Sequence, residues 1–476
     1  MRTEGDVAVD ARPLREVLRS RDRISIESHP RYKPAVLFVI MAGVAASSFA
    51  NMLLVAALPE ISDDLHTRTS VVAWVNIAPA IAFGVSMPLF GKLGDLYGHR
   101  RVFIWGWTTA TVLAFATAFS PNIAALIVLR TASQLAGAST TPAAFGILAR
   151  IVAPEERARA FGRVVTVLSA SPVIAVVVGG PLVSSIGWRP MFIAQAAIAT
   201  VAVIAAVPLL PETPRRPDVR FDIAGALTLT IAVVGLLFAL NRVGDWGMDH
   251  RAVQLTAVFG TAGLAAFGLV ERRAAEPLLR ASWLTRRDVG APVATNFFAH
   301  VTLMGLQVTG AFLLKRVFGY GTGTVALLTG LRPAAFSVAA SLSARHARSI
   351  GIRWVLLSGN VMLAVGCVVT AVGVQQHSIV IVVVSIVLTG FGVGYGRPGL
   401  VTAITNAVDE GDAGVANGVL AMAGQIGSSV GQTMLVAIIG TSAAAGAFAN
   451  AAWAAAASAL LAVAMSALII YREAAT

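Results

Sequence analysis

Long apolar segments, separated by short polar connections, fill the chain from residue 35 to residue 471. A helix needs about 20 apolar residues to cross the hydrocarbon core of a bilayer, and inside that core the backbone must satisfy its own hydrogen bonds. The sequence therefore predicts an all-α polytopic membrane protein with 14 transmembrane helices. The segments lie near residues 35–57, 71–90, 102–119, 122–148, 161–184, 190–210, 223–241, 252–270, 289–314, 322–344, 354–374, 378–406, 414–440 and 448–471.

Composition narrows the class of function. Of the 476 residues, 57% are hydrophobic and 13% are charged, and the net charge is +12. The basic residues are spread between apolar segments rather than gathered in one domain, which argues against a nucleic-acid partner. The single cysteine, Cys367, permits no internal disulfide, and the sequence shows no metal-binding Cys/His spacing, phosphate-binding glycine loop or nucleophile elbow. We therefore expect no enzyme activity and no cofactor, although a proton gradient could drive the protein.

The distribution of lysine and arginine predicts the orientation in the membrane. With the first span running outward, cytoplasmic loops and tails, counted together with Arg163 at the cytoplasmic start of the fifth span, carry 27 of the 36 Lys and Arg residues, and outward-facing loops carry six. The positive-inside rule then places both termini in the cytoplasm of a multi-pass protein of the plasma (cell inner) membrane. The basic N-terminal arm, residues 1–34, and a short tail, residues 472–476, are both cytoplasmic in this topology.

One polar connection, between the second and third spans, has the composition of a gate. Its glycines allow tight turns and close approach of backbones, and its acidic residue can attract the positive N-terminal end of a nearby helix, for which we expect the thirteenth span near Ala413. We predict that this loop latches two halves of the molecule on the cytoplasmic side. The gating residues are Gly91, Gly94, Asp95, Gly98, Arg100 and Arg101.

A fainter copy of that loop lies at residues 344–353, where Gly351 aligns with Gly98 and Arg353 with Arg100. The repetition predicts two related six-helix bundles, at residues 35–210 and 289–471, with two additional linker helices and their loops at residues 211–288. Repeated bundles of this kind are typical of alternating-access transporters, which bind substrate near the midplane between the halves.

The loop from Gly91 to Arg101 resembles the loop between the second and third helices of the major facilitator superfamily. Further stretches resemble its fourteen-helix drug:proton antiporter branch: Ala57 to Ile61, Trp74, Arg130, Gly179-Gly180 with Gly187 to Phe192, and Gly319-Tyr320. The resemblance covers residues 35–471 and implies export of small amphipathic compounds. Ala50 stands where that branch usually has a buried aspartate, and Ala175-Val176 stand where its antiporter signature has Gly-Pro. Proton coupling is therefore left open.

The predicted spans contain arginine but no Asp or Glu away from their ends. An unpaired cation at the bilayer centre costs about 2.5 to 3.5 kcal/mol on insertion scales. We therefore expect Arg130, Arg332 and Arg397 to face a cavity and to influence substrate or proton affinity, with snorkelling to the interface as the alternative, above all for Arg397. His300 is the mid-chain candidate for carrying a proton. Its alternative role is that of a histidine held by a neighbouring group.

Neutral polar side chains within the spans are further candidates for the cavity wall. The candidates are Asn51, Asn76, Asn296 and Gln307. The alternative is that these amides hydrogen-bond neighbouring helices together, which is common in membrane proteins. Because the spans offer no carboxylate for a desolvated cation, we expect a neutral, zwitterionic or anionic amphipathic substrate, such as a drug or a lipid-like molecule. The alternatives are a non-transporting membrane sensor or scaffold and an integral membrane lipid-modifying enzyme. We expect a monomer whose partners are this substrate and the lipid bilayer.

Overall fold

The structure is a computed structural model that describes residues 32–152, 167, 171, 187–213, 223–274, 283, 286–408 and 413–469. All regular secondary structure in these residues is helical. The helices of the first part of the chain are α3 (Tyr32–Asp64), α4 (Thr69–Val72), α5 (Trp74–Tyr97), α6 (His99–Thr117), α7 (Ile123–Gly137), α8 (Thr140–Ile151) and α10 (Arg189–Leu209). They are followed by α11 (Ile223–Trp246), α12 (Arg251–Arg273), α14 (Arg287–Arg316), α15 (Thr322–Ile350), α16 (Ile352–Gln375), α17 (Ile379–Asn406), α18 (Ala413–Ile439) and α19 (Ala445–Ala467).

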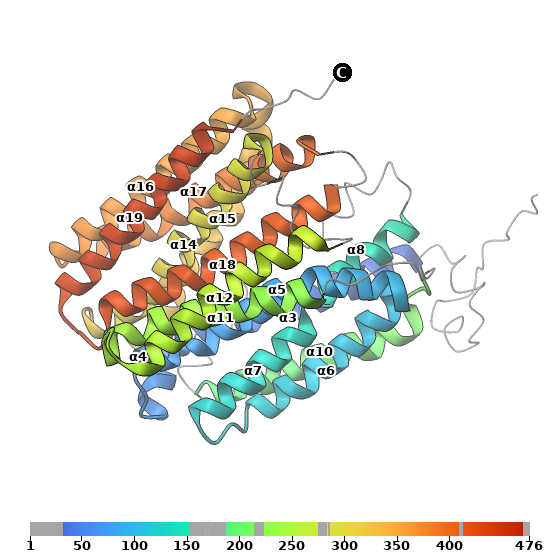
Figure 1. Cartoon of the computed structure of the whole chain (residues 1–476), viewed down its shortest axis with the longest axis horizontal. Helices are drawn as coiled ribbons and strands as arrows, with labels where there is room; N and C mark the ends of the chain where they lie inside the picture. Colours follow the sequence, from blue (N-terminus) through green and yellow to red (C-terminus); the bar gives the residue numbers. More distant parts are fainter. Residues whose placement is uncertain are drawn as a thin grey trace, which may run out of the picture.

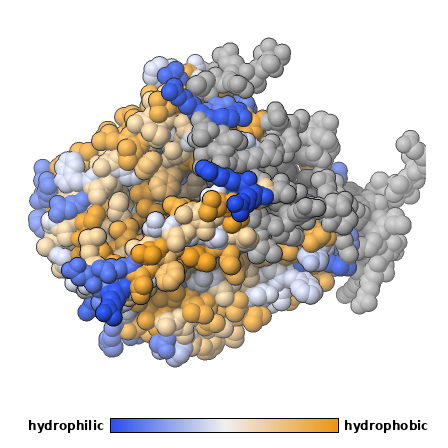
Figure 2. Space-filling model, in the orientation of Figure 1, coloured by the Kyte–Doolittle hydropathy of each residue, from blue (hydrophilic) through white to orange (hydrophobic). Residues whose placement is uncertain are grey.

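The described helices match a membrane protein in length and in surface. Ten of them are long and apolar enough to cross a membrane, and shorter apolar stretches occur at Tyr32–Gly43 and Thr69–Gly84. Figure 2 shows apolar side chains over most of the visible middle of the molecule and polar side chains at its left edge. Every predicted span except the fifth overlaps a described helix. The fifth, residues 161–184, lies almost entirely outside the described residues, as do residues 1–31 of the predicted N-terminal arm and the predicted tail, 472–476.

The helices form two groups that lie side by side (Figure 1). In the first group, α10 packs on α3 and α6, and α7 packs on α5 and α6. In the second group, α14 packs on α18 and α19, while α17 packs on α15 and α16. The groups meet where α5 lies along α18 and where α3 contacts α14 and α15. The helix pair α11 and α12 lies against this seam, because α11 contacts both α5 and α18.

The molecule has two ends, which we call distal and proximal. The distal end is where α3, α14 and α18 finish and where α5, α10 and α15 begin. The proximal end is where α3 begins and where α6 and α16 follow the two glycine turns described below. Under the predicted topology the distal end faces outward.

Glycine lets neighbouring helices in the second group approach closely. A Cβ added at Gly392 of α17 would lie 2.6 Å from the carbonyl oxygen of Gly359 on α16, and one added at Gly359 would lie 2.6 Å from the carbonyl oxygen of Gly392. The two backbones therefore touch at this point, and neither position has room for a side chain. Close approach of this kind is how transmembrane helices gain packing without a hydrophobic driving force.

The predicted loop at Gly91–Arg101 is wrong in one respect, because it is almost entirely helical. Helix α5 continues to Tyr97 and α6 begins at His99, with the single residue Gly98 between them at φ 93°. A helix that leaves the bilayer can continue into water, and a glycine can reverse the chain because it has no Cβ to clash at positive φ. The same geometry recurs at Gly351, φ 84°, between α15 and α16. The faint sequence repeat is thus matched by a repeated turn.

Candidate functional site

The contacts of the Gly98 turn lie within the first group of helices. The Arg100 guanidinium forms an ion pair with Glu212 and also donates a hydrogen bond to the Val207 carbonyl at 2.6 Å. The backbone N–H of His99 donates to Thr213 Oγ1 at 2.6 Å. Arg100 and His99 therefore tie the start of α6 to the end of α10 and to the segment that follows it. The side chain of Asp95 is outside the described residues, so its latch onto α18 stays a prediction.

The glycines of this turn have distinct uses. A side chain at Gly94 would collide with the His99 imidazole, and a side chain at Gly146 of α8 would collide with its other edge. Gly94 thus makes room for His99, while Gly98 makes the turn itself. Gly91 is less constrained, because a Cβ there would make an ordinary 3.8 Å contact with Pro142. Arg101 is exposed.

Arg130 lies on α7 in the interior of the first group. It is 2% exposed, and its guanidinium carbon lies 5.5 Å from the centre of the Phe192 ring of α10. This is cation–π geometry, which favours a cation most strongly in a desolvated setting. The snorkelling alternative does not apply to Arg130, because its side chain is enclosed by protein.

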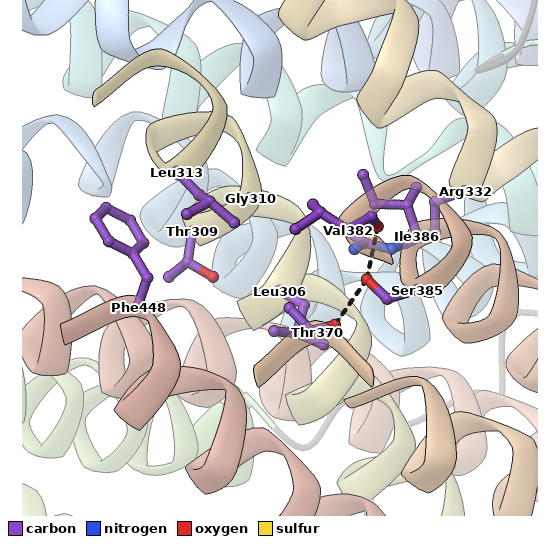
Figure 3. Close-up of a pocket in the computed structure, with 10 residues that line it drawn as sticks. All are labelled: Leu306, Thr309, Gly310, Leu313, Arg332, Thr370, Val382, Ser385, Ile386 and Phe448. Atoms are coloured by element: carbon purple, nitrogen blue, oxygen red, sulfur yellow. Dashed lines mark hydrogen bonds between the residues drawn. The ribbon is translucent and has the colours of Figure 1, made fainter. Parts of the chain in front are cut away.

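Arg332 lies on α15 in the interior of the second group. It is 4% exposed. Its Nε donates to Thr389 Oγ1 of α17 at 3.1 Å, and its Nη1 donates to Gln307 Oε1 of α14 at 2.8 Å. A cavity borders its guanidinium (Figure 3). The guanidinium therefore joins three helices through neutral groups.

Arg397 and His300 form a second polar layer on the same helix pair, α14 and α17. Arg397 Nη1 lies 2.8 Å from His300 Nε2, and His300 Nδ1 lies 2.9 Å from the Asn296 carbonyl oxygen. A carbonyl can only accept and a guanidinium can only donate. The imidazole is therefore neutral, with its hydrogen on Nδ1 and a lone pair on Nε2. His300 is seven positions before Gln307 on α14, so this layer lies about 10 Å to the proximal side of Arg332.

The predicted neutral wall residues connect helices. Asn76 on α5 donates to Gln432 Oε1 on α18 at 2.6 Å, across the seam between the two groups. Asn296 donates to the Leu420 carbonyl of α18 at 2.6 Å and is 1% exposed. Gln307, also 1% exposed, is held by Arg332. Asn76, Asn296 and Gln307 thus follow the interhelical alternative, while the side chain of Asn51 is outside the described residues.

Contacts at the distal end also join the two groups. Lys315 Nζ at the end of α14 lies 2.8 Å from Asp63 Oδ2 at the end of α3. The adjacent Arg316 donates a hydrogen bond from Nη2 to the hydroxyl of Thr69, which begins α4, and another from Nη1 to the Gly440 carbonyl at 3.2 Å. Thr69 is 1% exposed. The molecule is therefore closed across the seam at this end.

A separate acid at the distal end is paired within the first group. Asp64 Oδ2 accepts hydrogen bonds from Arg189 Nη1 at 2.7 Å and from Trp188 Nε1 at 3.1 Å. The Arg189 hydrogen bond is the main reason that the pKa of the Asp64 carboxyl falls below its usual value, and the Trp188 hydrogen bond adds to it. Arg189 also stacks on the Trp188 ring at 4.3 Å, so one guanidinium orders both partners.

Sequence reasoning missed several of these partners. Thr389 and Thr69 are common residues in helices, and their significance appears only when an arginine from a distant helix reaches them. Asn241 of α11 is a further example, because it accepts a hydrogen bond from Trp74 Nε1 at 3.0 Å and so holds α11 against α5. The one available signal was the Lys315-Arg316 pair, since two adjacent cations at a span end invite acidic and hydroxyl partners.

Comparison with known proteins identifies the family. Residues 40–274 match the profile of the Major Facilitator Superfamily. The probable actinorhodin transporter of Streptomyces coelicolor is 30% identical over 426 residues, which are 86% of this chain and 72% of that protein. The chain belongs to the major facilitator superfamily. Other relatives are Multidrug resistance protein 3 of Bacillus subtilis, 24% identical over 84% of this chain and 78% of that protein, and the Tetracenomycin C resistance and export protein of Streptomyces glaucescens, 27% identical over 84% and 74%.

Solved structures agree on the fold. The peptide transporter POT in complex with sulfate has a TM-score of 0.69 at 15% identity and covers 96% of this chain and 100% of its own. An inward-facing bacterial homologue of the lysosomal transporter Spinster has a TM-score of 0.64 at 14% identity, over 92% and 96%. At these identities the likeness concerns the fold alone. The protein is accordingly a membrane-spanning major facilitator transporter and not an enzyme.

Proposed function

We propose that this major facilitator protein is a secondary active exporter of small amphipathic compounds that are neutral, zwitterionic or anionic, including drug-like and lipid-like molecules. It works in the plasma membrane with 14 spans arranged as six, two and six and with both termini in the cytoplasm. The relatives named for multidrug resistance and antibiotic export support the direction and the breadth of substrate. They also favour a transporter over a sensor or a lipid-modifying enzyme.

The proposed substrate charge rests on the neutral partners of two arginines inside the second group, Arg332 and Arg397. Arg332 is bonded to an amide and a hydroxyl, and Arg397 to an imidazole. Among the described residues, the buried carboxylate is that of Glu271, in the last turn of α12 at the proximal end and far from the midplane. A desolvated substrate cation would meet positive charge in the core and, among the described residues there, no buried acid to balance it, which is costly in a medium of low dielectric constant. An anionic or neutral substrate avoids that cost.

The distal contacts support transport by alternating access. Asp63 with Lys315 and Thr69 with Arg316 join the two groups at one end, and Asn76 with Gln432 joins them further in. These few polar contacts can be exchanged for contacts with water when the two groups of helices rock apart. The distal-closed arrangement is one of the two states that such a cycle needs, and the predicted Asp95 latch would close the other end.

The pair of His300 and Arg397 supplies a route for proton coupling that needs no buried acid. With its hydrogen on Nδ1, His300 accepts the Arg397 hydrogen bond at Nε2. A proton added at Nε2 would remove that lone pair and set two cations against each other, which separates α14 from α17 at this level. Among the described residues of α14, α17 and α18, Arg397 is the charged group in contact with His300. A proton gradient is the only driving force that this proposal invokes, and the transporting unit is a monomer.

Transport by the purified chain in proteoliposomes tests the proposal. A panel of cationic, neutral and anionic amphiphiles of similar size would be assayed with and without an imposed pH gradient. We expect movement of the neutral and anionic compounds, and a raised KM for the anionic ones in Arg130→Gln with the neutral ones less affected. Arg345→Gln, an exposed arginine at the proximal end of α15, is the matched control. Robust transport of the permanent cation ethidium that is unchanged in Arg130→Gln would refute the assigned substrate charge.

A further inference from the structure

A small cavity lies inside the second group of helices, against the Arg332 guanidinium. Figure 3 shows the residues around it, which come from α14, α15, α16, α17 and α19. Its polar wall consists of Arg332 and the hydroxyls of Thr309, Thr370 and Ser385, and the remainder is apolar, including Leu306. All of the lining residues therefore belong to helices of the second group.

The hydrogen bonds of Arg332 leave part of its guanidinium facing this cavity. Nε and one Nη1 hydrogen are used by Thr389 and Gln307. The guanidinium has further N–H donors, and among the described residues they have no acceptor. The nearby hydroxyls already donate to backbone carbonyls of their own helices: Thr309 to Gly305 at 2.9 Å, Thr370 to Gly366 at 2.9 Å and Ser385 to Val382 at 2.7 Å. The guanidinium therefore supplies both the positive charge and the N–H donors that face the cavity.

The charge of Arg332 is not balanced by the protein. A guanidinium stays protonated under ordinary conditions, and in the described residues it has no carboxylate partner. The adjacent ionisable side chain, Cys367, is buried and free. A buried cation with only neutral partners carries a large desolvation penalty. An anion in direct contact with the guanidinium removes most of that penalty.

We propose that this cavity is a binding site for a small monovalent anion of halide size, held by Arg332 within the second group. The volume sets the size of the guest: at about 20 Å³ the cavity holds about one water-sized particle. A chloride or bromide ion fits this space with little adjustment, whereas an amphipathic substrate does not. The same donors could take the carboxylate oxygen of an organic anion inserted from outside. The small volume favours the free ion. The site goes beyond the proposed export function because anion binding there requires no transported substrate.

Thermal unfolding of the full chain tests the site. The protein would be placed in nanodiscs of phosphatidylcholine, which adds no anionic headgroup, and tryptophan fluorescence would follow unfolding. Sodium chloride, bromide, acetate and gluconate would be compared at matched ionic strength. We expect a saturable rise in Tm with chloride and bromide, on the order of 2 to 4 °C, and little change with gluconate or acetate. Arg332→Gln is expected to lose the rise, and Arg345→Gln on the same helix is expected to keep it.

Four outcomes would overturn the proposal. Equal Tm curves in chloride and gluconate would show that only ionic strength acts, and an unchanged chloride effect in Arg332→Gln would place the ion elsewhere. A rise with acetate but not with chloride would assign the cavity to an organic carboxylate. Because Arg332→Gln can itself disturb folding, anomalous scattering from bromide-soaked wild-type crystals gives an independent readout. A bromide peak in contact with the Arg332 guanidinium supports the site, and its absence refutes it.

Discussion

Replacing Thr69 by valine removes one contact that closes the distal end and leaves the shape of the side chain nearly unchanged. Thr69 is 1% exposed, and its hydroxyl accepts a hydrogen bond from Arg316 across the seam. Arg316 also donates a hydrogen bond to the Gly440 carbonyl in its own group, and that bond does not oppose separation of the groups. The substitution therefore weakens the closed state selectively.

The expected size of the effect follows from the kind of bond. A hydrogen bond to a charged group contributes about 1.5 to 3 kcal/mol. Water can reach part of Arg316, which is only half-buried, so the lower end of that range applies. A loss of about 1.4 kcal/mol changes an equilibrium about tenfold. We therefore expect Thr69→Val to raise the ratio of distal-open to distal-closed molecules by roughly tenfold.

Spin labels can measure this ratio. Thr67→Cys, just before α4, and Ala443→Cys, in the turn after α18, place one label on each group at the distal end. The native Cys367 is buried and so does not take up label. Thr261→Val is the matched control, because that threonine is exposed on α12 and its hydroxyl bonds only within its own helix, at 2.8 Å from the Ala257 carbonyl. A distance distribution in Thr69→Val identical to that in Thr261→Val would refute the reasoning.

Three further predictions concern pH and packing. Because the Arg189 hydrogen bond lowers the pKa of Asp64 in the folded state, the pair should stabilise the protein above about pH 4 and lose that effect as the pH falls further. Tm should then drop more steeply on acidification in the wild type than in Asp64→Asn. Parallel curves of Tm against pH would contradict this prediction. His300→Gln should retain transport but flatten its dependence on lumenal pH, and an unaltered pH profile in proteoliposomes would leave His300 with a structural role only. Gly392→Ala should destabilise the protein by about 1 to 3 kcal/mol through overlap with the neighbouring backbone, which would lower the unfolding temperature. Gly418→Ala should leave the unfolding temperature unchanged, because an added Cβ there meets no atom within 4 Å. Equal effects of the two substitutions would show that the close contact tolerates a methyl group.

The Gly98 turn shows how local sequence and tertiary structure divide the information. Glycines in a polar stretch between two spans predicted a change of direction, and Gly98 makes it. The sequence did not show that helix persists to within one residue on both sides, because a helix end in water is decided by small local energies. Nor did it show that Arg100 pairs with Glu212, since that contact depends on where α10 ends relative to α6.

The buried polar residues divide in the same way. That Arg130, Arg332 and Arg397 occur in apolar segments without a neighbouring acid was plain from the sequence, and the cost of exposing a cation to lipid predicted that they face a cavity. The structure shows that Arg130 and Arg332 are enclosed by protein. The sequence did not show which side chains contact these arginines. Arg332 is 25 positions from Gln307 and 57 from Thr389, and Arg397 is 97 from His300.

By itself, the sequence determined that this protein is a helical membrane protein and where most of its helices run. The bilayer imposes that result, because length and hydropathy alone satisfy its demand for apolar, internally bonded segments. Only the tertiary structure decided which side chains meet. A helix can rotate about its axis and slide along it without changing its hydropathy, and those two movements determine whether Arg397 reaches His300, whether Asn76 reaches Gln432, and whether a cavity remains beside Arg332.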